Sequence, residues 1–154
     1  MVLAPHFSMT EVARSGTAAE QGIDNSVPLS LRYNVGRIAE FMECVRWLLG
    51  DVPIIVTSWY RCQMLNSAVG GSKTSAHMKG LAMDFKHSVM ALEDVFVEIR
   101  ASKLPYDQLI IEGTQGKTEW MHVGLSIGEP RLEAMTADRD RIDGPMAYTR
   151  MVEG

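Results

Sequence analysis

The sequence predicts a single α+β domain with a small, mainly antiparallel sheet flanked by helices. Its 154 residues are 46% hydrophobic and 22% charged, a length and composition that suit one domain with one core. One long stretch has helical periodicity, and several short β-branched runs between glycine-containing segments have the length of strands. We expect the core of the domain to cover residues 7–127 and a C-terminal tail to follow over 128–154.

The clearest predicted helix covers residues 31–49. Its apolar residues recur in steps of three and four, and Gly50 closes it. Ser8 and Glu11 have the spacing of a capping box, which predicts a short helix near the start. We expect further helices over 61–69 and 89–102 and a polar loop over 18–28.

Four predicted strands complete the domain. They are short runs with β-branched or other apolar residues, over 53–58, 81–85, 107–112 and 119–125. The segment after Pro130 is charged and weakly patterned, so we expect a surface wrap or a partly disordered end there.

The charge and hydropathy of the sequence limit the classes of binding partner that we expect. The formal net charge is -4, and no basic stripe appears, so we expect no nucleic-acid partner. No run reaches the roughly 20 apolar residues of a membrane helix, so we expect no stable membrane association. The first residues carry no basic segment before their short apolar stretch. We therefore expect that the chain has no secretory signal and that it is synthesised in the cytoplasm.

Three residues have the chemistry of a metal site. His77, Asp84 and His122 form the kind of ligand set that holds a zinc ion and leaves one position open. Glu119 precedes the last of these by three residues and supplies a group that handles protons. On a regular strand Glu119 points away from Trp120 and His122, so serving the same metal requires a bend or a bulge near Trp120. The set predicts a zinc hydrolase.

These residues also carry a resemblance. The motif Ser-x-His-x-x-Gly-x-Ala-x-Asp over residues 75–84, followed by Trp-x-His over 120–122, resembles the zinc D-alanyl-D-alanine carboxypeptidases and dipeptidases and the related phage L-alanyl-D-glutamate endopeptidases. The resemblance covers most of residues 7–125. It extends to the segments 56–62, 65–72 and 106–112, which are similar to those of short phage and prophage members.

The resemblance implies a role for each matching residue. His77, Asp84 and His122 would bind Zn²⁺, and Glu119 would be the general base that takes a proton from water at the metal. Arg61 would steady the scissile carbonyl or the developing oxyanion, and a substrate carboxylate is a further candidate contact for it. Ser75 would either lie near the substrate or brace the metal-binding loop. Some carboxypeptidases of the family have a second histidine two residues before the last ligand. In this sequence Trp120 occupies that position, and its presence favours the branch of the family in which a glutamate is the base.

The function that follows is a zinc metallopeptidase of 154 residues that hydrolyses the peptidoglycan stem peptide. We expect a monomeric phage or prophage endolysin with L-alanyl-D-glutamate endopeptidase activity, reaching the cell wall from the host cytoplasm by holin-type release. One alternative is a D-Ala-D-Ala carboxypeptidase or dipeptidase with the same metal chemistry. Another is a non-catalytic wall-binding module of the virion.

Overall fold

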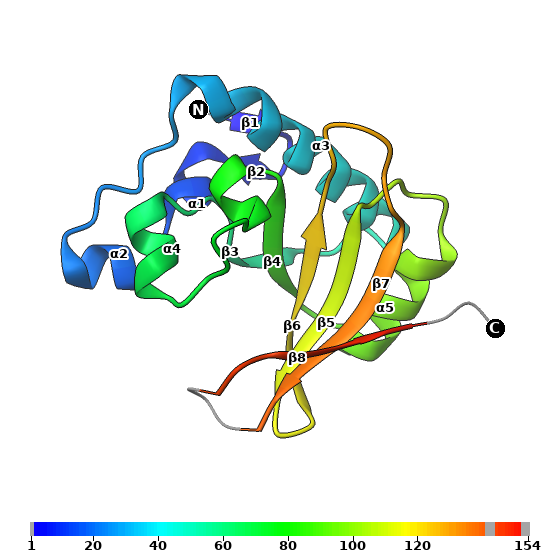
Figure 1. Cartoon of the computed structure of the whole chain (residues 1–154). Coiled ribbons are helices and arrows are strands. Elements are labelled where there is room, and N and C mark those ends of the chain that lie inside the picture. Colours follow the sequence, from blue (N-terminus) through cyan, green and yellow to red (C-terminus); the bar gives the residue numbers. More distant parts are fainter. Residues whose placement is uncertain (1, 141–143, 152–154) are drawn as a thin grey trace.

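The protein folds around a six-stranded sheet, with a short two-stranded ribbon near its N-terminus (Figure 1). The computed structural model describes residues 2–140 and 144–151. Strands β1 and β2 form the ribbon, and the larger sheet has the order β3-β4-β6-β5-β7-β8. The strands are β1 Val2–Ala4, β2 Phe7–Ser8, β3 Ile54–Ser58, β4 Ala82–His87, β5 Gln108–Thr114, β6 Lys117–Gly124, β7 Glu133–Arg139 and β8 Ala147–Arg150.

The larger sheet is mainly antiparallel, as the sequence predicts. Only the β5–β7 pair, among the described strand pairs, is parallel. The β5–β6 hairpin is tight, and β4 lies on the other side of β6. The centre of the sheet is therefore built from β4, β6 and β5, which places these three strands together where a site can form.

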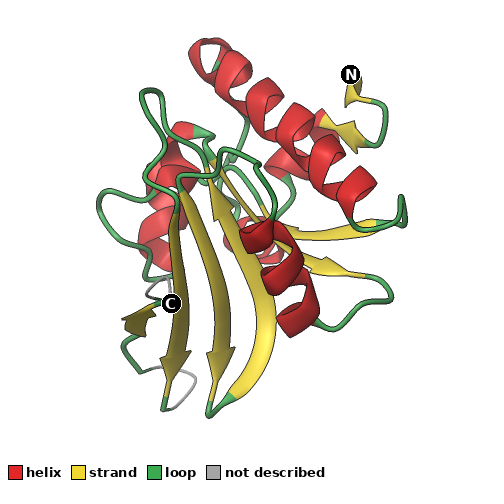
Figure 2. Cartoon of the chain, turned by 90° about the vertical axis from the view of Figure 1, so that its right-hand side faces the viewer, coloured by secondary structure: helices red, strands yellow, loops and turns green. Residues whose placement is uncertain are grey.

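Two helices cover one face of the sheet (Figure 2). Helix α3, Arg32–Leu48, and helix α5, Leu92–Ala101, present their buried apolar residues to the core. On the sheet side, the core receives alternate residues of the central strands, because successive side chains of a strand point to opposite faces. They include Met83 and Phe85 of β4, Leu109 and Ile111 of β5, and Met121 and Val123 of β6.

The remaining helices are short. They are α1 Met9–Ala13, α2 Gly16–Gln21, α4 Gln63–Ala68 and the 3₁₀ turns η1 Leu29–Leu31 and η2 Ala76–Lys79. The predicted capping box is confirmed, since the Ser8 backbone N–H donates to the Glu11 carboxylate at 2.8 Å. The predicted loop over 18–28 is wrong at its start, because residues 18–21 belong to α2. That helix begins after Ser15, whose hydroxyl accepts from the Ala18 N–H.

The C-terminal segment differs most from the expectation of a surface wrap or a disordered end. Residues 133–139 form β7, which extends the sheet beside β5, and β8 pairs with β7. Ala134 is buried in the main core, while Met135 and Ala137 pack with Ile110 on the opposite face. The run has too few large apolar residues to be recognised as a strand. Its burial comes from pairing with distant residues.

Among the described residues, no helix combines the length and the apolar character that crossing a bilayer requires.

Candidate metal centre

Three elements bring the predicted metal ligands together. His77 lies in η2, Asp84 in β4 and His122 in β6, and all three residues are buried. Asp84 and His122 stand directly opposite each other in the β4–β6 register. One ligand atom from each of the three residues lies within 4.8 Å of the others. The structure therefore assembles in space three residues that are up to 45 positions apart in the sequence.

The ring of His77 is held in the orientation that a metal ligand needs. Its Nδ1 lies 2.6 Å from the Trp59 carbonyl oxygen, to which it donates when it carries the proton. The other ring nitrogen, Nε2, then presents its lone pair toward Asp84 Oδ1 at 3.1 Å and His122 Nδ1 at 3.3 Å. Such a hydrogen bond to a backbone carbonyl is what fixes metal-binding histidines.

The donor set fits a divalent cation. With the His77 proton on Nδ1, Nε2 and Asp84 Oδ1 turn lone pairs toward each other, and a cation between them satisfies both. Burial lowers the pKa of His77, which favours the neutral ring that a metal requires. Two imidazoles and one carboxylate are zinc ligands, and they leave a coordination position for substrate or water.

Asp84 is the anionic centre of the group. Burial alone would raise its pKa, but the charges and hydrogen bonds of His77 and His122 hold the pKa of Asp84 far below its ordinary value. The reciprocal effect acts on His122: burial opposes protonation, yet the hydrogen bond and charge of Asp84 raise the pKa of His122. The lowered pKa favours the ionised carboxylate of Asp84, the form that binds a cation.

Glycine at position 80 is required by the local backbone. Gly80 ends η2 with a φ of 66°, in the left-handed region, and its N–H donates to the carbonyl oxygen of His77. A Cβ there would lie 2.9 Å from Val35 Cγ2 of α3. The turn therefore packs against α3 and leads from the buried histidine directly into β4.

Arg61 stands beside the metal ligands. Its guanidinium lies 3.5 Å from Asp84 Oδ2, and its backbone N–H donates to the His77 carbonyl. Asn25 fixes the neighbouring backbone, since its amide donates to the Tyr60 carbonyl and its oxygen accepts from the Cys62 N–H. Buried Asn25 is thus a positioning residue for Arg61. The sequence alone did not indicate this role of Asn25.

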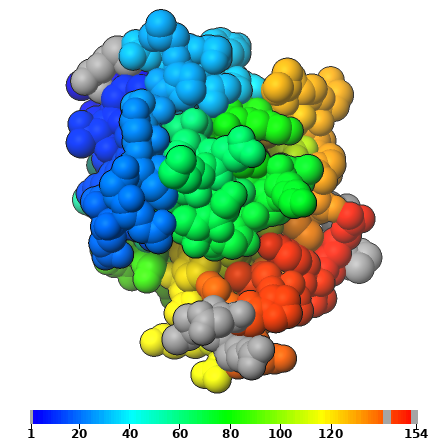
Figure 3. Space-filling model, turned by 60° about the vertical axis from the view of Figure 1, so that its left-hand side comes forward, coloured from blue at the N-terminus to red at the C-terminus, as the bar shows by residue number. Residues whose placement is uncertain are grey.

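The metal ligands open into a cleft of about 960 Å³. One wall is the segment 69–79, and the other is formed by residues within 125–139 and 144–148. Figure 3 shows these as green surface bordered by orange and red. Ser75 lies on the first wall, partly buried, where it precedes η2. Its two predicted roles, bracing the loop and contacting a substrate, are both compatible with this position.

The bulge that Glu119 needs is present in the β5–β6 hairpin. Glu112 pairs with Trp120 while Gly113 pairs with Thr118, which leaves Glu119 without a partner in the ladder. The carboxylate of Glu119 accepts a hydrogen bond from Thr114 Oγ1 at 2.9 Å. Among the described residues, those that line the cleft include Glu112 and not Glu119. The catalytic role of Glu119 therefore stays a prediction.

Glu112 is the carboxylate that the structure adds to the site. It projects from β5 on the same face as His122, because its neighbour Ile110 two residues away is the partner of His122. Burial, reinforced by the Asp84 charge, raises the pKa of Glu112. Its position at the end of a predicted strand does not indicate a role at the site, and the strand register shows that it faces the cleft.

Comparison with known families agrees with this geometry. The model of the family described as Peptidase M15 matches residues 5–124, well over half of the chain. The chain belongs to the peptidase M15 family. The match includes His77, Asp84 and His122, so a peptidase with a group that could hold a metal is established. No curated protein matches the chain as a relative.

The M15 match ends at Gly124, within the sheet. Strands β7 and β8 lie beyond it, although both contribute to the cleft. The cleft and site residues to which the sequence analysis assigned no role are accordingly Asn25, Glu112 and Tyr148. Sequence signals for them are weak, since none belongs to a motif with metal-ligand spacing.

Proposed function

We propose that this M15 peptidase is a zinc-dependent peptidoglycan hydrolase that cleaves the stem peptide, as an L-alanyl-D-glutamate endopeptidase of the phage or prophage endolysin type. The observation that supports it is the buried His77–Asp84–His122 group at the base of a cleft with two walls. Zinc, when bound there, supplies a Lewis acid that polarises the scissile carbonyl and activates water.

The cleft also contains the groups that orient a substrate. Arg61 stays positively charged and offers a planar set of N–H donors to a carbonyl oxygen or a carboxylate. Ser75 adds a hydroxyl on the wall formed by residues 69–79. Since D-glutamate residues of stem peptides carry carboxylates, a guanidinium close to the metal ligands suits this substrate class.

Proton transfer requires a carboxylate, and the structure offers two. Glu119 is the base that the sequence predicts, and the bulge frees it from the strand ladder. Glu112 lies in the cleft itself, beside Asp84 and His122. In either case the carboxylate accepts a proton from the attacking water and returns one to the leaving amine nitrogen.

Paired variants separate the two carboxylates. Glu119→Gln keeps an oxygen that accepts from Thr114, so its fold is preserved and only its basicity is lost. Loss of a general base lowers kcat by about 10² to 10⁴-fold. The base is the glutamate whose replacement by glutamine causes this decrease in kcat. Each variant, Glu112→Gln and Glu119→Gln, serves as the matched control for the other.

Mass spectrometry of products from purified peptidoglycan, with zinc and with a chelator, tests the proposed function. We expect new peptides that begin with D-glutamate, released only without chelator. Free D-alanine as the product would instead assign a carboxypeptidase. Absence of any product would contradict peptidoglycan hydrolysis, and wall binding that persists without lysis would support a virion binding module.

A further inference from the structure

The C-terminal strands form part of the cleft although they lie outside the family match. Strand β7 pairs with β5 in parallel, and β8 covers its other side as an edge strand. The peptidase fold up to residue 124 supplies the metal ligands, and the later residues supply a facing wall. The side chains of that wall include Arg131, Glu133, Met135, Arg139, Met146 and Tyr148.

One row across the sheet connects this wall to the metal centre. Glu112 of β5 pairs with Ala137 of β7, and Ala137 pairs with Tyr148 of β8. Directly paired residues project from the same face of a sheet, and neighbouring strands lie about 4.8 Å apart. Only the methyl group of Ala137 stands between the two larger side chains. The phenol of Tyr148 can therefore lean over Ala137 toward the cleft, which it lines.

The electrostatic surroundings of Tyr148 agree with this placement. Partial burial raises the pKa of its phenol, and the carboxylates of Glu112 and Asp84 raise that pKa further. The raised pKa favours the neutral phenol, a hydrogen-bond donor, at the cleft that the metal ligands also line. With 58% of the residue exposed, it is also accessible to a molecule in the cleft.

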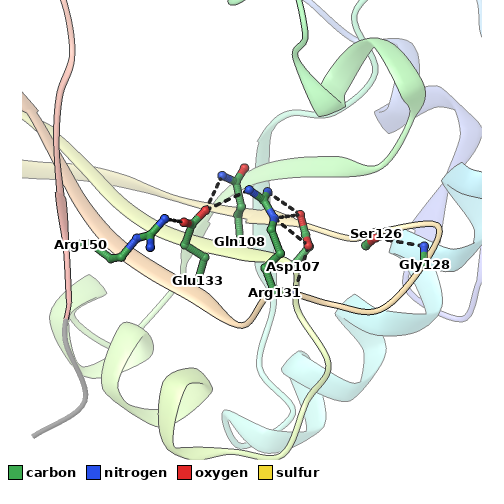
Figure 4. Close-up of polar contacts among 7 residues, drawn as sticks. All are labelled: Asp107, Gln108, Ser126, Gly128, Arg131, Glu133 and Arg150. Carbon is green, nitrogen blue, oxygen red and sulfur yellow. Dashed lines mark hydrogen bonds and ion pairs between the residues drawn. The ribbon is translucent and has the colours of Figure 1, made fainter.

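A polar network fixes this wall at the end of the sheet (Figure 4). Arg131 donates to both carboxylate oxygens of Asp107, at distances of 2.6 to 3.1 Å. Glu133 accepts from Gln108 at 3.2 Å and also pairs with Arg131 and with Arg150 of β8. These contacts join the starts of β5 and β7 to the end of β8, so Tyr148 is presented from an anchored strand.

Apolar side chains form the floor between the two ends of the wall. Ile110, Met135 and Ala137 are buried together, and Met146 packs against them. A peptide lying across this floor would place aliphatic groups on the methionines and its carbonyl oxygens near the phenol.

We propose that β7 and β8 are a substrate-binding wall, and that the Tyr148 hydroxyl donates a hydrogen bond to a carbonyl or carboxylate oxygen of the bound stem peptide. This inference rests on the proposed function, because it names the same substrate. It assigns Tyr148 to substrate binding and not to proton transfer, since the carboxylates already serve that step.

The test compares Tyr148→Phe with the parent and with Tyr33→Phe, a tyrosine that is 77% exposed on α3. Hydrolysis of a synthetic stem peptide by the zinc-loaded protein gives KM and kcat. Calorimetric titration of the same peptide into zinc-free protein gives Kd without turnover. Loss of a neutral hydrogen bond corresponds to about a 3- to 10-fold weakening.

We expect KM and Kd to rise by that factor in Tyr148→Phe, with kcat within about twofold of the parent, and Tyr33→Phe to match the parent. Unchanged KM and Kd would overturn the inference while leaving the proposed function standing. A fall in kcat alone would also overturn it, because the phenol would then act only in the transition state. An inactive parent that binds no peptide would overturn the proposed function, and the inference with it.

Discussion

Replacing Asp84 by asparagine removes the charge on which the metal centre depends and keeps its shape. The Asp84 carboxylate lies 2.8 Å from His122 Nδ1, 3.1 Å from His77 Nε2 and 3.5 Å from the Arg61 guanidinium. The side chains of Asp84 and Arg61 are only 13% and 16% exposed. In Asp84→Asn, Arg61 therefore keeps its positive charge in a largely buried place without its nearest counter-charge.

The expected cost to the metal-free protein is about 3 kcal/mol in free energy of unfolding. Removing one partner of a buried ion pair costs about 3 to 5 kcal/mol. The lower end applies here, because the Arg61–Asp84 contact is long and Glu112 remains as a second carboxylate near Arg61. For a chain of this length that corresponds to a decrease in Tm of roughly 6 to 12 °C.

Urea unfolding of both proteins in chelator measures this difference directly. Asp94→Asn is the matched control, since it removes the same charge from an exposed position in the first turn of α5 and should cost no more than about 1 kcal/mol. A zinc titration of the same samples should show binding to the parent and at least a 100-fold loss in Asp84→Asn, about 2.7 kcal/mol. Equal stability and equal zinc affinity in parent and variant would refute the account of this site.

Three further predictions concern the hairpin, the C-terminal wall and the metal. Gly113→Ala places a Cβ 2.3 Å from the Lys117 carbonyl oxygen, so urea unfolding should show a loss of about 1 to 3 kcal/mol; unchanged stability would mean that the hairpin is open. Arg131→Ala should cost up to about 1 kcal/mol near neutral pH. The hydrogen bonds of Arg131 lower the pKa of Asp107. Arg131 therefore stabilises the fold above the pKa that Asp107 has in the unfolded chain, and this stabilisation is lost as the pH falls through the pKa that Asp107 has in the folded protein. A difference in free energy of unfolding between parent and Arg131→Ala that stays constant from pH 7 to pH 2 would contradict this prediction. Zinc at 100 times its Kd should add about 2.7 kcal/mol, raising Tm by roughly 5 to 10 °C in thermal unfolding, and a chelator should reverse the change; an equal Tm in both conditions would argue against a metal site in the folded state.

The central strands and the metal ligands were predictable because their signals are local. Helix α3 has a clear three- and four-residue periodicity, and the motif over residues 75–84 has fixed spacing. The structure gives the physical reason for that spacing: His77 is the buried residue of η2, Gly80 ends that turn in the left-handed region, and Asp84 is the third residue of β4. His122 was predictable from the Trp-x-His segment over residues 120–122, three residues after Glu119.

The parts that sequence reasoning missed depend on pairing between distant residues. Strand β7 is recognisable only from its parallel register with β5, since Met135 is the one large apolar residue in its own run. Glu112 and Tyr148 reach the cleft through the same register, and neither has a neighbour in sequence that indicates it. The bulge at Glu119 was inferred as a requirement, but the hydrogen bond with Thr114 was not.

The most direct test of the central claim is hydrolysis measured against the zinc bound per chain. Metal-free protein receives zinc in steps, and stem-peptide cleavage is recorded at each step. The account predicts that activity rises linearly and reaches its plateau at about one zinc per chain, as a single three-residue site requires. Full activity in the metal-free protein, or a plateau that Asp84→Asn reaches equally well, would contradict it.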